Sequence, residues 1–255
     1  MPITLTPLTG IPLVRHGNNL ADIVVNALQE NSISLEDNDI LVIAQKIISK
    51  AEGRTVNLAT VTPSQRAIEL ARQVEKDPRV VELILQESNE VLRTRIGAII
   101  VEHKLGFVCA NAGIDHSNVA GAGDSIAEWV LLLPTEPDRS AGKLRDEIKS
   151  KAGKRVGILI IDSHGRAWRN GTVGVAIGIA GLPGLEDLRG KPDLFGYTLQ
   201  VTQVGVADEL AAAASLMMGQ AAEGTPVVHV RGFPYPLRES KTKELIRPKE
   251  QDLFR

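Results

Sequence analysis

The stretch Val108-Cys-Ala-Asn-Ala-Gly-Ile-Asp-His-Ser-Asn118 leaves an apolar, strand-like run, turns at its glycine, and presents the carboxylate of Asp115 among small polar side chains. A second apolar run, Val156-Gly-Ile-Leu-Ile-Ile161, is expected to end as a strand directly before Asp162-Ser163-His164-Gly165-Arg166. Aspartate and glycine are both common where a strand gives way to a turn. Two buried strands that each end in an aspartate and a glycine-assisted turn are typical of the two halves of one metal or phosphate site.

Composition and charge exclude several classes of protein. The chain has 255 residues, of which 43% are hydrophobic and 24% charged, as in an ordinary globular protein of one large or two small domains. A net charge of −2 with scattered Lys and Arg argues against nucleic-acid partners and an anionic-membrane face. The single cysteine, Cys109, excludes an intramolecular disulfide and a cysteine-based zinc site. We see no signal peptide and no apolar run of the roughly 20 residues that a membrane helix needs, so a cytoplasmic protein is expected.

The order of the segments predicts an α+β fold. Aromatic residues make up only 3% of the chain, so the core is expected to consist of Val, Ile, Leu and Ala in sheets covered by helices. The expected secondary structure changes from helix-rich to β-rich near residue 89 and back near 198. This change predicts a β-rich middle domain, 89–197, inserted in an outer α/β domain, 1–88 and 198–255. Strands are expected at 3–5, 39–44, 91–93, 96–102, 107–110, 156–161, 172–181 and 226–231, and helices at 19–31, 62–76, from 77–78 onward, at 140–152 and at 204–220.

Common nucleotide-binding loops are missing from the sequence. Arg189-Gly190-Lys191 is followed by proline and lacks the upstream glycine of a phosphate-binding loop. Gly121-Ala-Gly123, in a glycine- and alanine-rich loop at 119–125, lacks the third small residue of a dinucleotide fingerprint. Phosphate chemistry must therefore depend on other residues.

Asp115 and Asp162 are the sharpest candidates for chemistry. Mg²⁺ and Mn²⁺ prefer hard oxygen ligands, and two aspartates with Ser163 and Asn118 as neutral donors match that preference. The alternative is that both aspartates only cap turns, where this residue is common. Spacing alone leaves both interpretations open.

Four other side chains can be interpreted either as catalytic or binding residues or as ordinary structural or surface residues. His116 and His164 are candidate general bases, but alternation along an extended chain predicts that they point away from the aspartates into surface or structural roles. Cys109 lies in an apolar run and is expected to be a small buried hydrophobe. Lys50, beside a serine after an apolar strand, can neutralise a phosphate or can simply be solvated.

Five motifs, in chain order from Leu8 to about Gly232, make the sequence resemble one enzyme family. They are Leu8-Thr-Gly-Ile-Pro-Leu-Val14, Ser49-Lys-Ala-Glu-Gly-Arg54, Asn111-Ala-Gly-Ile-Asp-His-Ser-Asn118, Ile161-Asp-Ser-His-Gly-Arg166, and Met218-Gly-Gln220 with Glu223-Gly-Thr-Pro226. The set resembles the GTP-dependent L-glutamate ligases, or CofE-like γ-glutamyl ligases, that extend the tail of the deazaflavin coenzyme F420. The resemblance implies a two-domain, non-Rossmann α+β fold, an active site in the cleft between the domains, and a homodimer.

The resemblance also implies a reaction. Such ligases join L-glutamate by its amino group to the lactyl carboxylate of the coenzyme precursor, then add a second glutamate through the γ-carboxylate, splitting GTP to GDP and phosphate. An acyl phosphate is the expected intermediate, because a carboxylate is inert to amines until one oxygen becomes a leaving group. Two divalent ions, Mg²⁺ or Mn²⁺, are expected to screen the phosphate charge, and K⁺ is a further candidate ion.

Roles for individual residues follow from the same motifs. Asp115, Asp162 and Lys50 would be catalytic, and the metal ligands would be Asp115, Asp162, Ser163 and Gln220. GTP would contact Ile11, Pro12, Leu13, Val14, Gln45, Lys46, Lys50, Asn118, Met218, Gly219, Gln220, Ala221, Ala222, Glu223, Gly224 and Thr225. Two alternatives from other classes are a metal-dependent phosphohydrolase, which would not need glutamate, and a non-catalytic nucleotide-binding protein, which would bind without turnover.

Overall fold

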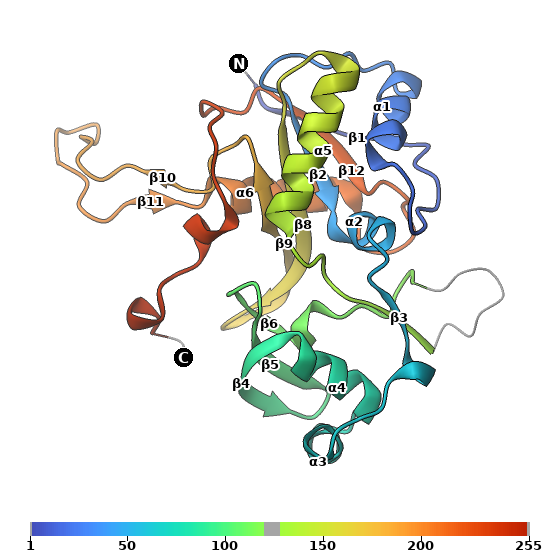
Figure 1. The fold of residues 1–255 in the computed structure, drawn as a ribbon. Helices are drawn as coiled ribbons and strands as arrows, with labels where there is room; N and C mark the ends of the chain where they lie inside the picture. Colours follow the sequence, from blue (N-terminus) through green and yellow to red (C-terminus); the bar gives the residue numbers. More distant parts are fainter. Residues whose placement is uncertain (1, 120–127, 254–255) are drawn as a thin grey trace.

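The computed structural model describes residues 2–119 and 128–253, which form an α+β fold with several sheets. Most of the loop expected at 119–125, including Gly121 and Gly123, lies outside the described residues. Figure 1 shows the main sheet in the upper part of the molecule and a smaller unit below it. No helix among the described residues is long and apolar enough to cross a membrane.

The main sheet has five strands in the order β1-β12-β2-β8-β9. Their bounds are Thr4–Pro7 (β1), Val227–Arg231 (β12), Ile40–Ala44 (β2), Gly157–Arg166 (β8) and Arg169–Ala180 (β9). Among these strands only β2 and β8 run parallel, and every other neighbouring pair is antiparallel. A Rossmann sheet is mostly parallel, so the expectation of a non-Rossmann α+β fold agrees with this topology.

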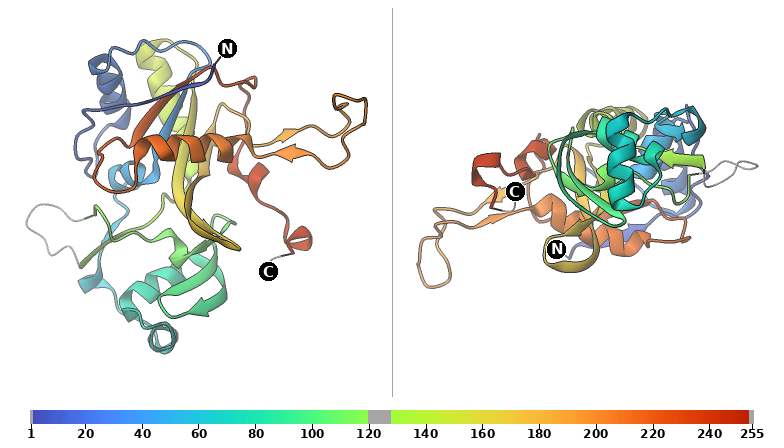
Figure 2. Two further views of the ribbon diagram at one scale, coloured as in Figure 1. Left: turned by 180° about the vertical axis from the view of Figure 1, so that it is seen from behind. Right: turned by 90° about the horizontal axis from the view of Figure 1, so that it is seen from below.

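Side chains of the central strands alternate between two cores, because successive residues of a strand face opposite sides of the sheet. Leu41 and Ile43 of β2 join the core beneath helices α1 (Leu20–Glu30) and α5 (Pro137–Ala152). Ile40 and Val42 join the opposite core, beneath helix α6 (Val206–Met218). The two faces are seen in turn in Figures 1 and 2, with α5 over one side and α6 across the other. Near-continuous apolar strands are what a sheet buried on both faces requires.

A smaller unit with its own core is inserted between the short helix α2 (Gln45–Ala51) and α5. It contains α3 (Gln65–Val74), α4 (Pro78–Gln86), the sheet β4-β5-β6 (Ser88–Arg95, Ala98–His103, Val108–Ala110) and the pair β3-β7 (Thr55–Asn57, Trp129–Leu131). Its buried residues run from Leu58 to Leu132. The predicted division into two domains, 1–88 with 198–255 and 89–197, remains a prediction. Strands β8 and β9 of that range hydrogen-bond into the main sheet, while α3 and α4, expected in the outer domain, pack on the smaller core.

Glycines in β9 let helices approach the sheet closely. A Cβ built on Gly174 would lie 2.4 Å from the Ala211 carbonyl oxygen of α6, and one on Gly178 would lie 2.7 Å from the carbonyl group of Pro137 in α5. Any larger residue would push a helix away, so the glycine-spaced run serves tight packing. The prediction of a tightly packed strand at 172–181 is confirmed.

Three predicted boundaries are wrong, one because of strand pairing and two because of how a helix begins. Strand β8 does not end at residue 161 but continues to Arg166, because β9 pairs with it along its whole length. The helix expected from residue 62 begins at Gln65, because Ser64 caps it by accepting a hydrogen bond from Ala67 N–H. The helix expected from residue 140 begins at Pro137, a residue suited to the first turn of a helix.

Two further segments lie outside these cores. Strands β10 (Glu186–Asp187) and β11 (Gln203–Val204) form the base of a long arm that projects from the body (Figure 1). Residues 233–253 run from β12 back across the molecule, with short 3-10 turns at Thr242–Leu245 and Lys249–Gln251. The second segment matters below because it lines a cavity.

Candidate active site

A strained turn and a short bridge fix the position of Asp115. Asn111, Ala112 and Gly113 all have positive φ, at 52°, 52° and 65°, so the chain reverses sharply after β6. A Cβ on Gly113 would lie 2.7 Å from a methyl carbon of Leu133, so only glycine fits this turn. Asp115 then exchanges both backbone hydrogen bonds with Leu131 of β7, at 3.0 and 2.9 Å. The turn predicted at Gly113 is confirmed, and it delivers the carboxylate on a fixed backbone.

The Asp115 carboxylate meets the beginning of α2. Gln45 Nε2 donates to Asp115 Oδ2 at 2.8 Å, and Lys46 Nζ lies 3.5 Å from Oδ1. Gln45 is itself held by Ser49, whose hydroxyl donates to Gln45 Oε1 at 2.9 Å. Lys46 also donates to Ser117 Oγ at 2.8 Å. Residues 70 positions apart in sequence are thus brought together.

Burial and, to a smaller extent, the negative charge of Asp162 raise the pKa of Asp115 to about 6, despite the lowering effect of Lys46. Desolvation and a like charge both disfavour the ionised carboxylate. The two aspartates singled out in the sequence therefore act on each other electrostatically. Two nearby carboxylates whose negative charges are not fully balanced by cations are common in functional sites.

Asp162 lies on β8 beside two ring side chains. His164 Nε2 is 3.0 Å from Asp162 Oδ2, and both side chains are only 11% exposed. The Phe107 ring packs on His164 with ring centres 5.2 Å apart. The prediction that His164 points away from the aspartate is wrong, because residues two apart on a strand share a face. His116, in contrast, is exposed, consistent with its predicted surface role.

Two further hydrogen bonds join β8 and the Asp115 segment to the loop after α6. Ser163 Oγ donates to Gln220 Oε1 at 3.0 Å, and Gln220 Nε2 donates to Ser215 Oγ at 2.9 Å. Asn118 Nδ2 donates to the Ala221 carbonyl oxygen at 3.2 Å. The predicted site residues from three distant segments therefore lie side by side.

The loop at 218–225 is held by its own side chains. Ala221 N–H donates to Glu223 Oε2 at 2.8 Å, and Thr225 Oγ1 donates to the Met218 carbonyl oxygen at 3.1 Å. Hydrogen bonds from backbone N–H groups, that of Ala221 first, lower the pKa of the Glu223 carboxyl. Gly219 adopts a φ of 72° at the end of α6. The remaining loop residues expected at the nucleotide, Ala222 and Gly224, are exposed.

Lys50, in the last turn of α2, and the loop 11–14 are less directly connected to the aspartates. Burial lowers the pKa of Lys50, and the neighbouring charge of Lys46 lowers it further. Gly17 N–H donates to the Ala51 carbonyl oxygen at 3.0 Å, which ties the loop to the end of α2. Within this loop Ile11 and Val14 pack on the main core, whereas Pro12 and Leu13 are exposed. Among the described residues, no hydrogen bond links positions 11–14 to Asp115 or Asp162.

Cys109 is an inert core residue. It is buried, and burial together with the nearby charge of Asp162 raises the pKa of its thiol to about 12. A thiol that stays protonated is a poor nucleophile. The interpretation of Cys109 as a small buried hydrophobe is confirmed.

The donor set suits a hard divalent cation. Asp115 and Asp162 supply carboxylate oxygens, and Ser163 and Gln220 supply neutral oxygens, the types that Mg²⁺ and Mn²⁺ prefer. In residues 2–119 and 128–253 no group of three or more His, Cys, Asp or Glu side chains is arranged to hold a metal. A site here would therefore depend on two carboxylates plus neutral oxygens and substrate phosphates. The raised pKa of Asp115 is an observation that fits such a site, because a cation would favour the ionised form.

Three contributors were not recognised from the sequence. Ser215 holds Gln220, Ser117 receives Lys46, and Phe107 packs on His164. Ser117 lies inside the Asp115 motif. The position of His164, two residues after Asp162, could have been predicted, because residues two apart on a strand face the same side. Ser215 and Phe107 meet the site only through tertiary contacts, and no local pattern marks them.

Comparison with known proteins gives a consistent result. A family model described as F420-0:Gamma-glutamyl ligase matches residues 10–232. The chain is 46% identical to the coenzyme F420:L-glutamate ligase of Methanothermobacter thermautotrophicus, with all of both chains covered. It is 45% identical to the enzyme of the same description from Methanocaldococcus jannaschii, covering 96% of this chain and 94% of that one. The identity to the Methanococcus maripaludis ligase is 49%, over 87% and 86% of the two chains. The chain belongs to the F420-0:gamma-glutamyl ligase family.

Proposed function

We propose that this protein uses GTP to attach L-glutamate to a deazaflavin coenzyme F420 precursor. The first amide bond joins the amino group of glutamate to the lactyl carboxylate, and a second glutamate is then added through the γ-carboxylate of the first. GDP and phosphate are the other products. Membership of the ligase family supports the reaction class, and the chemistry below concerns the roles of this chain's own residues.

One observation carries the assignment of the site. Asp115, Asp162 and the loop after α6 come from three separate parts of the chain, and hydrogen bonds of Ser163 and Asn118 connect the two aspartate segments to that loop. Gln45 holds Asp115 against α2. The negative charge of Asp162 contributes to the raised pKa of Asp115, and Lys46 and Lys50 add two cations one helical turn apart on α2. Paired carboxylates beside lysines and a glycine-containing loop suit a metal–nucleotide complex.

An acyl phosphate explains why the reaction needs GTP. The acceptor carboxylate carries a poor leaving group, so its oxygen must first take the terminal phosphoryl group. The amine of glutamate then attacks the carbonyl carbon and phosphate leaves with the electron pair of the broken C–O bond. Positioning and charge compensation are the main contributions that a protein makes to phosphoryl transfer.

The proposed metal ligands are Asp115, Asp162, Ser163 and Gln220. Mg²⁺ or Mn²⁺ is the proposed divalent ion, two of them per site, with K⁺ as an accessory ion. The chemistry such ions supply when bound is screening of the negative charge on the phosphates. Asp115 and Asp162 fix the position of that positive charge, and Gln45 and His164 hold the two carboxylates in place through hydrogen bonds.

The proposed nucleotide contacts fall into two groups. Lys46, Lys50 and Asn118 would meet the phosphates, and Gln45 lies beside them. The exposed residues of the loops 11–14 and 218–225 would surround the rest of the nucleotide. Val14 is an exception within the first loop, because its side chain is buried and supports the loop. Only the backbone of Val14 would contact the nucleotide.

Glutamate-dependent release of phosphate from GTP is the experiment that tests this function. With the F420 precursor and Mg²⁺ present, phosphate is expected only when L-glutamate is also present, and mass spectrometry is expected to show the amide product. Reactions that lack one of the three substrates serve as controls. Release without glutamate would instead favour a phosphohydrolase, and GTP binding without turnover would favour a nucleotide-binding protein.

The proposed assembly is a homodimer. The arm between β10 and β11 exposes Leu194 and Phe195 by 98% and 95%, and burial of such side chains in a second copy would be favourable. Sedimentation velocity is expected to give twice the chain mass of 27.4 kDa for the wild type. The double variant Leu194→Ser, Phe195→Ser is expected to shift toward the monomer, and a monomeric wild type would contradict the proposal.

A further inference from the structure

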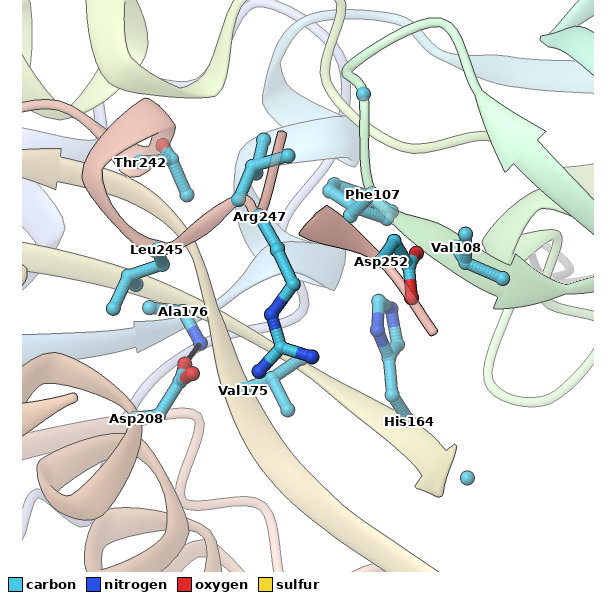
Figure 3. Close-up of a pocket in the computed structure, with 13 residues that line it drawn as sticks. Phe107, Val108, His164, Val175, Ala176, Asp208, Thr242, Leu245, Arg247 and Asp252 are labelled. Atoms are coloured by element: carbon cyan, nitrogen blue, oxygen red, sulfur yellow. Dashed lines mark hydrogen bonds between the residues drawn. The ribbon is translucent and has the colours of Figure 1, made fainter. Parts of the chain in front are cut away.

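A cavity of about 280 Å³ adjoins the aspartate site on the side of His164. Its walls come from the loop before β6, the hairpin β8–β9, the first turn of α6 and the C-terminal segment 242–252. Figure 3 shows the side chains that line it. Of the motifs recognised in the sequence, only His164 and Gly165 line this cavity, and the whole of its C-terminal wall lies outside the matched range 10–232.

One wall of the cavity is shared with the proposed catalytic centre. His164 lines the cavity and hydrogen-bonds Asp162 Oδ2 at 3.0 Å. Phe107 supplies an apolar wall, and its ring is fixed between His164 and the buried His103, with ring centres 5.2 Å away on each side. A ligand in the cavity therefore lies next to the residues proposed to handle the activated carboxylate.

The cavity presents charges of both signs. The Arg247 side chain crosses it, with its guanidinium group between Asp208 and His164 in the view of Figure 3. Within residues 2–119 and 128–253, Arg247 has no ion pair and no hydrogen bond. A guanidinium group offers a planar pair of donors that match a carboxylate.

Asp208 supplies the opposite charge. Its Oδ1 accepts a hydrogen bond from Ala176 N–H at 2.8 Å, which holds the carboxylate against β9. Among the described residues no hydrogen bond to Oδ2 is found, so this oxygen is available to a ligand. Burial raises the pKa of Asp208, and a cationic ligand would offset that cost.

Size and charge together define the ligand class. Cavities that enclose drug-sized molecules have volumes of about 300–1,000 Å³, so this one suits a smaller molecule and cannot enclose a deazaflavin coenzyme. A guanidinium group facing a carboxylate suits a molecule that has both a negative and a positive group. Free α-amino acids have both.

We propose that this cavity binds the amino-acid substrate, with a carboxylate of L-glutamate on Arg247 and its ammonium group at Asp208. This inference rests on the proposed ligase function, for which it names the place of the nucleophile. It explains why the cavity opens beside Asp162 rather than elsewhere on the sheet. It also gives the segment 242–252 a role, because this segment closes the cavity with Arg247.

Matched variants separate ligand contact from structural damage. Arg247→Gln removes the guanidinium from an exposed residue, and Lys243→Gln removes an exposed cation from the same segment as its control. Asp208→Asn keeps an oxygen that can accept from Ala176 N–H while it removes the charge, and its control is the neighbouring exposed Glu209→Gln. Arg247→Lys tests whether charge without the planar pair of donors is enough.

The test measures the affinity for L-glutamate by calorimetry, with GTP and Mg²⁺ absent and then present, and the KM values in the turnover assay. Arg247→Gln and Asp208→Asn are each expected to weaken L-glutamate binding about tenfold or more, with the KM for GTP unchanged. Both controls are expected to match the wild type, and Arg247→Lys is expected to fall between. Glutarate, which has no ammonium group, is expected to bind wild type and Asp208→Asn equally.

Three outcomes would overturn this inference. They are unchanged glutamate affinity in both variants, a wild type that does not bind L-glutamate in either condition, and a rise in the KM for the coenzyme precursor in place of glutamate. Failure of the proposed function looks different, because the wild type would then release phosphate without glutamate or not at all. The calorimetric comparison of the variants still decides the cavity's ligand in that case.

Discussion

Two buried carboxylate sites in this protein are built in opposite ways. Asp39, directly before β2, is 1% exposed and accepts hydrogen bonds from His229 Nε2 at 2.8 Å and from Arg231 Nε and Nη2 at 2.9 and 2.7 Å. Burial alone would raise the pKa of Asp39, but the hydrogen bonds from Arg231 and His229 outweigh it and lower the pKa. Asp115 also has a cation nearby, yet burial and Asp162 raise its pKa to about 6.

The difference separates structural from functional charge. Asp39 has its charge compensated by groups of the same sheet, so nothing further is needed there. Asp115 has one lysine, Lys46, at 3.5 Å, and Asp162 has one histidine, His164, at 3.0 Å. The second site is left in need of positive charge, which is what a metal–nucleotide complex would bring.

Loss of either carboxylate of the second site is expected to have the largest effect. Asp115→Asn or Asp162→Asn should lower glutamate-dependent phosphate release about a thousandfold, because the charge that positions the cation is lost. Thermal unfolding should be unchanged or slightly shifted upward, since each change relieves repulsion. Near-normal turnover in either variant would remove the assignment of that aspartate.

Loss of the Asp39 carboxylate is expected to lower the stability of the protein and to leave its activity unchanged. Asp39→Asn leaves His229 and Arg231 without their anionic partner and should lower the free energy of unfolding by about 2–3 kcal/mol. Turnover per folded molecule should stay close to wild type at a temperature where the variant is folded. Urea unfolding with a parallel turnover assay measures both, and a stable variant with reduced turnover would break the comparison.

Much of the main sheet was predictable, because the residues that form it are informative locally. Ile40–Ala44 and residues 156–161 are continuous apolar runs, as strands buried on both faces must be. Helix α2 was not predicted, because seven residues after a strand are too few for a helical period to show. The extension of β8 past Asp162 depends on pairing with β9, which is a tertiary property.

The site shows the same division. Asp115 and Asp162 stood out because each follows a buried strand and a glycine lies near. The partners that hold them, such as Gln45 and Phe107, come from other elements and meet them only after folding. The motif resemblance supplied the positions that chemistry alone left open, namely Lys50 and the loop 218–225.

His164 is expected to have a smaller effect than either aspartate. His164→Phe keeps a ring against Phe107 but removes the hydrogen bond to Asp162, and it should weaken Mn²⁺ binding about tenfold. His164→Gln keeps a donor and should restore part of the affinity, which a purely structural role would not predict. Electron paramagnetic resonance of free Mn²⁺ gives the affinity, and equal losses in the two variants would argue against positioning through the hydrogen bond.

The pH dependence of stability should differ in sign between the two sites. Without divalent ions, the folded state binds a proton at Asp115 more readily than the unfolded state, since the pKa is about 6 against an ordinary value of 3.8. Stability of the wild type relative to Asp115→Asn should therefore rise by about 2 kcal/mol as the pH falls from about 6 to about 4.

Asp39 should act in the opposite sense and at lower pH. Its pKa is lowered in the folded state, so its contribution is present above the ordinary value of 3.8 and is lost as the pH falls below it. The deficit of Asp39→Asn should shrink in that range. Urea unfolding in EDTA from pH 3 to 7 measures both differences, and a parallel pH response of the two sites would contradict the contrast drawn between them.

Mn²⁺ binding in the presence of GTP tests the central claim most directly, because it asks whether Asp115 and Asp162 form one cation site. Titration of the wild type, Asp115→Asn, Asp162→Asn and Asp39→Asn, followed by electron paramagnetic resonance, compares the two carboxylate sites in one experiment. Wild type and Asp39→Asn are expected to bind Mn²⁺ alike, and both site variants to lose at least about tenfold in affinity. Wild-type affinity in Asp115→Asn or Asp162→Asn would contradict the account.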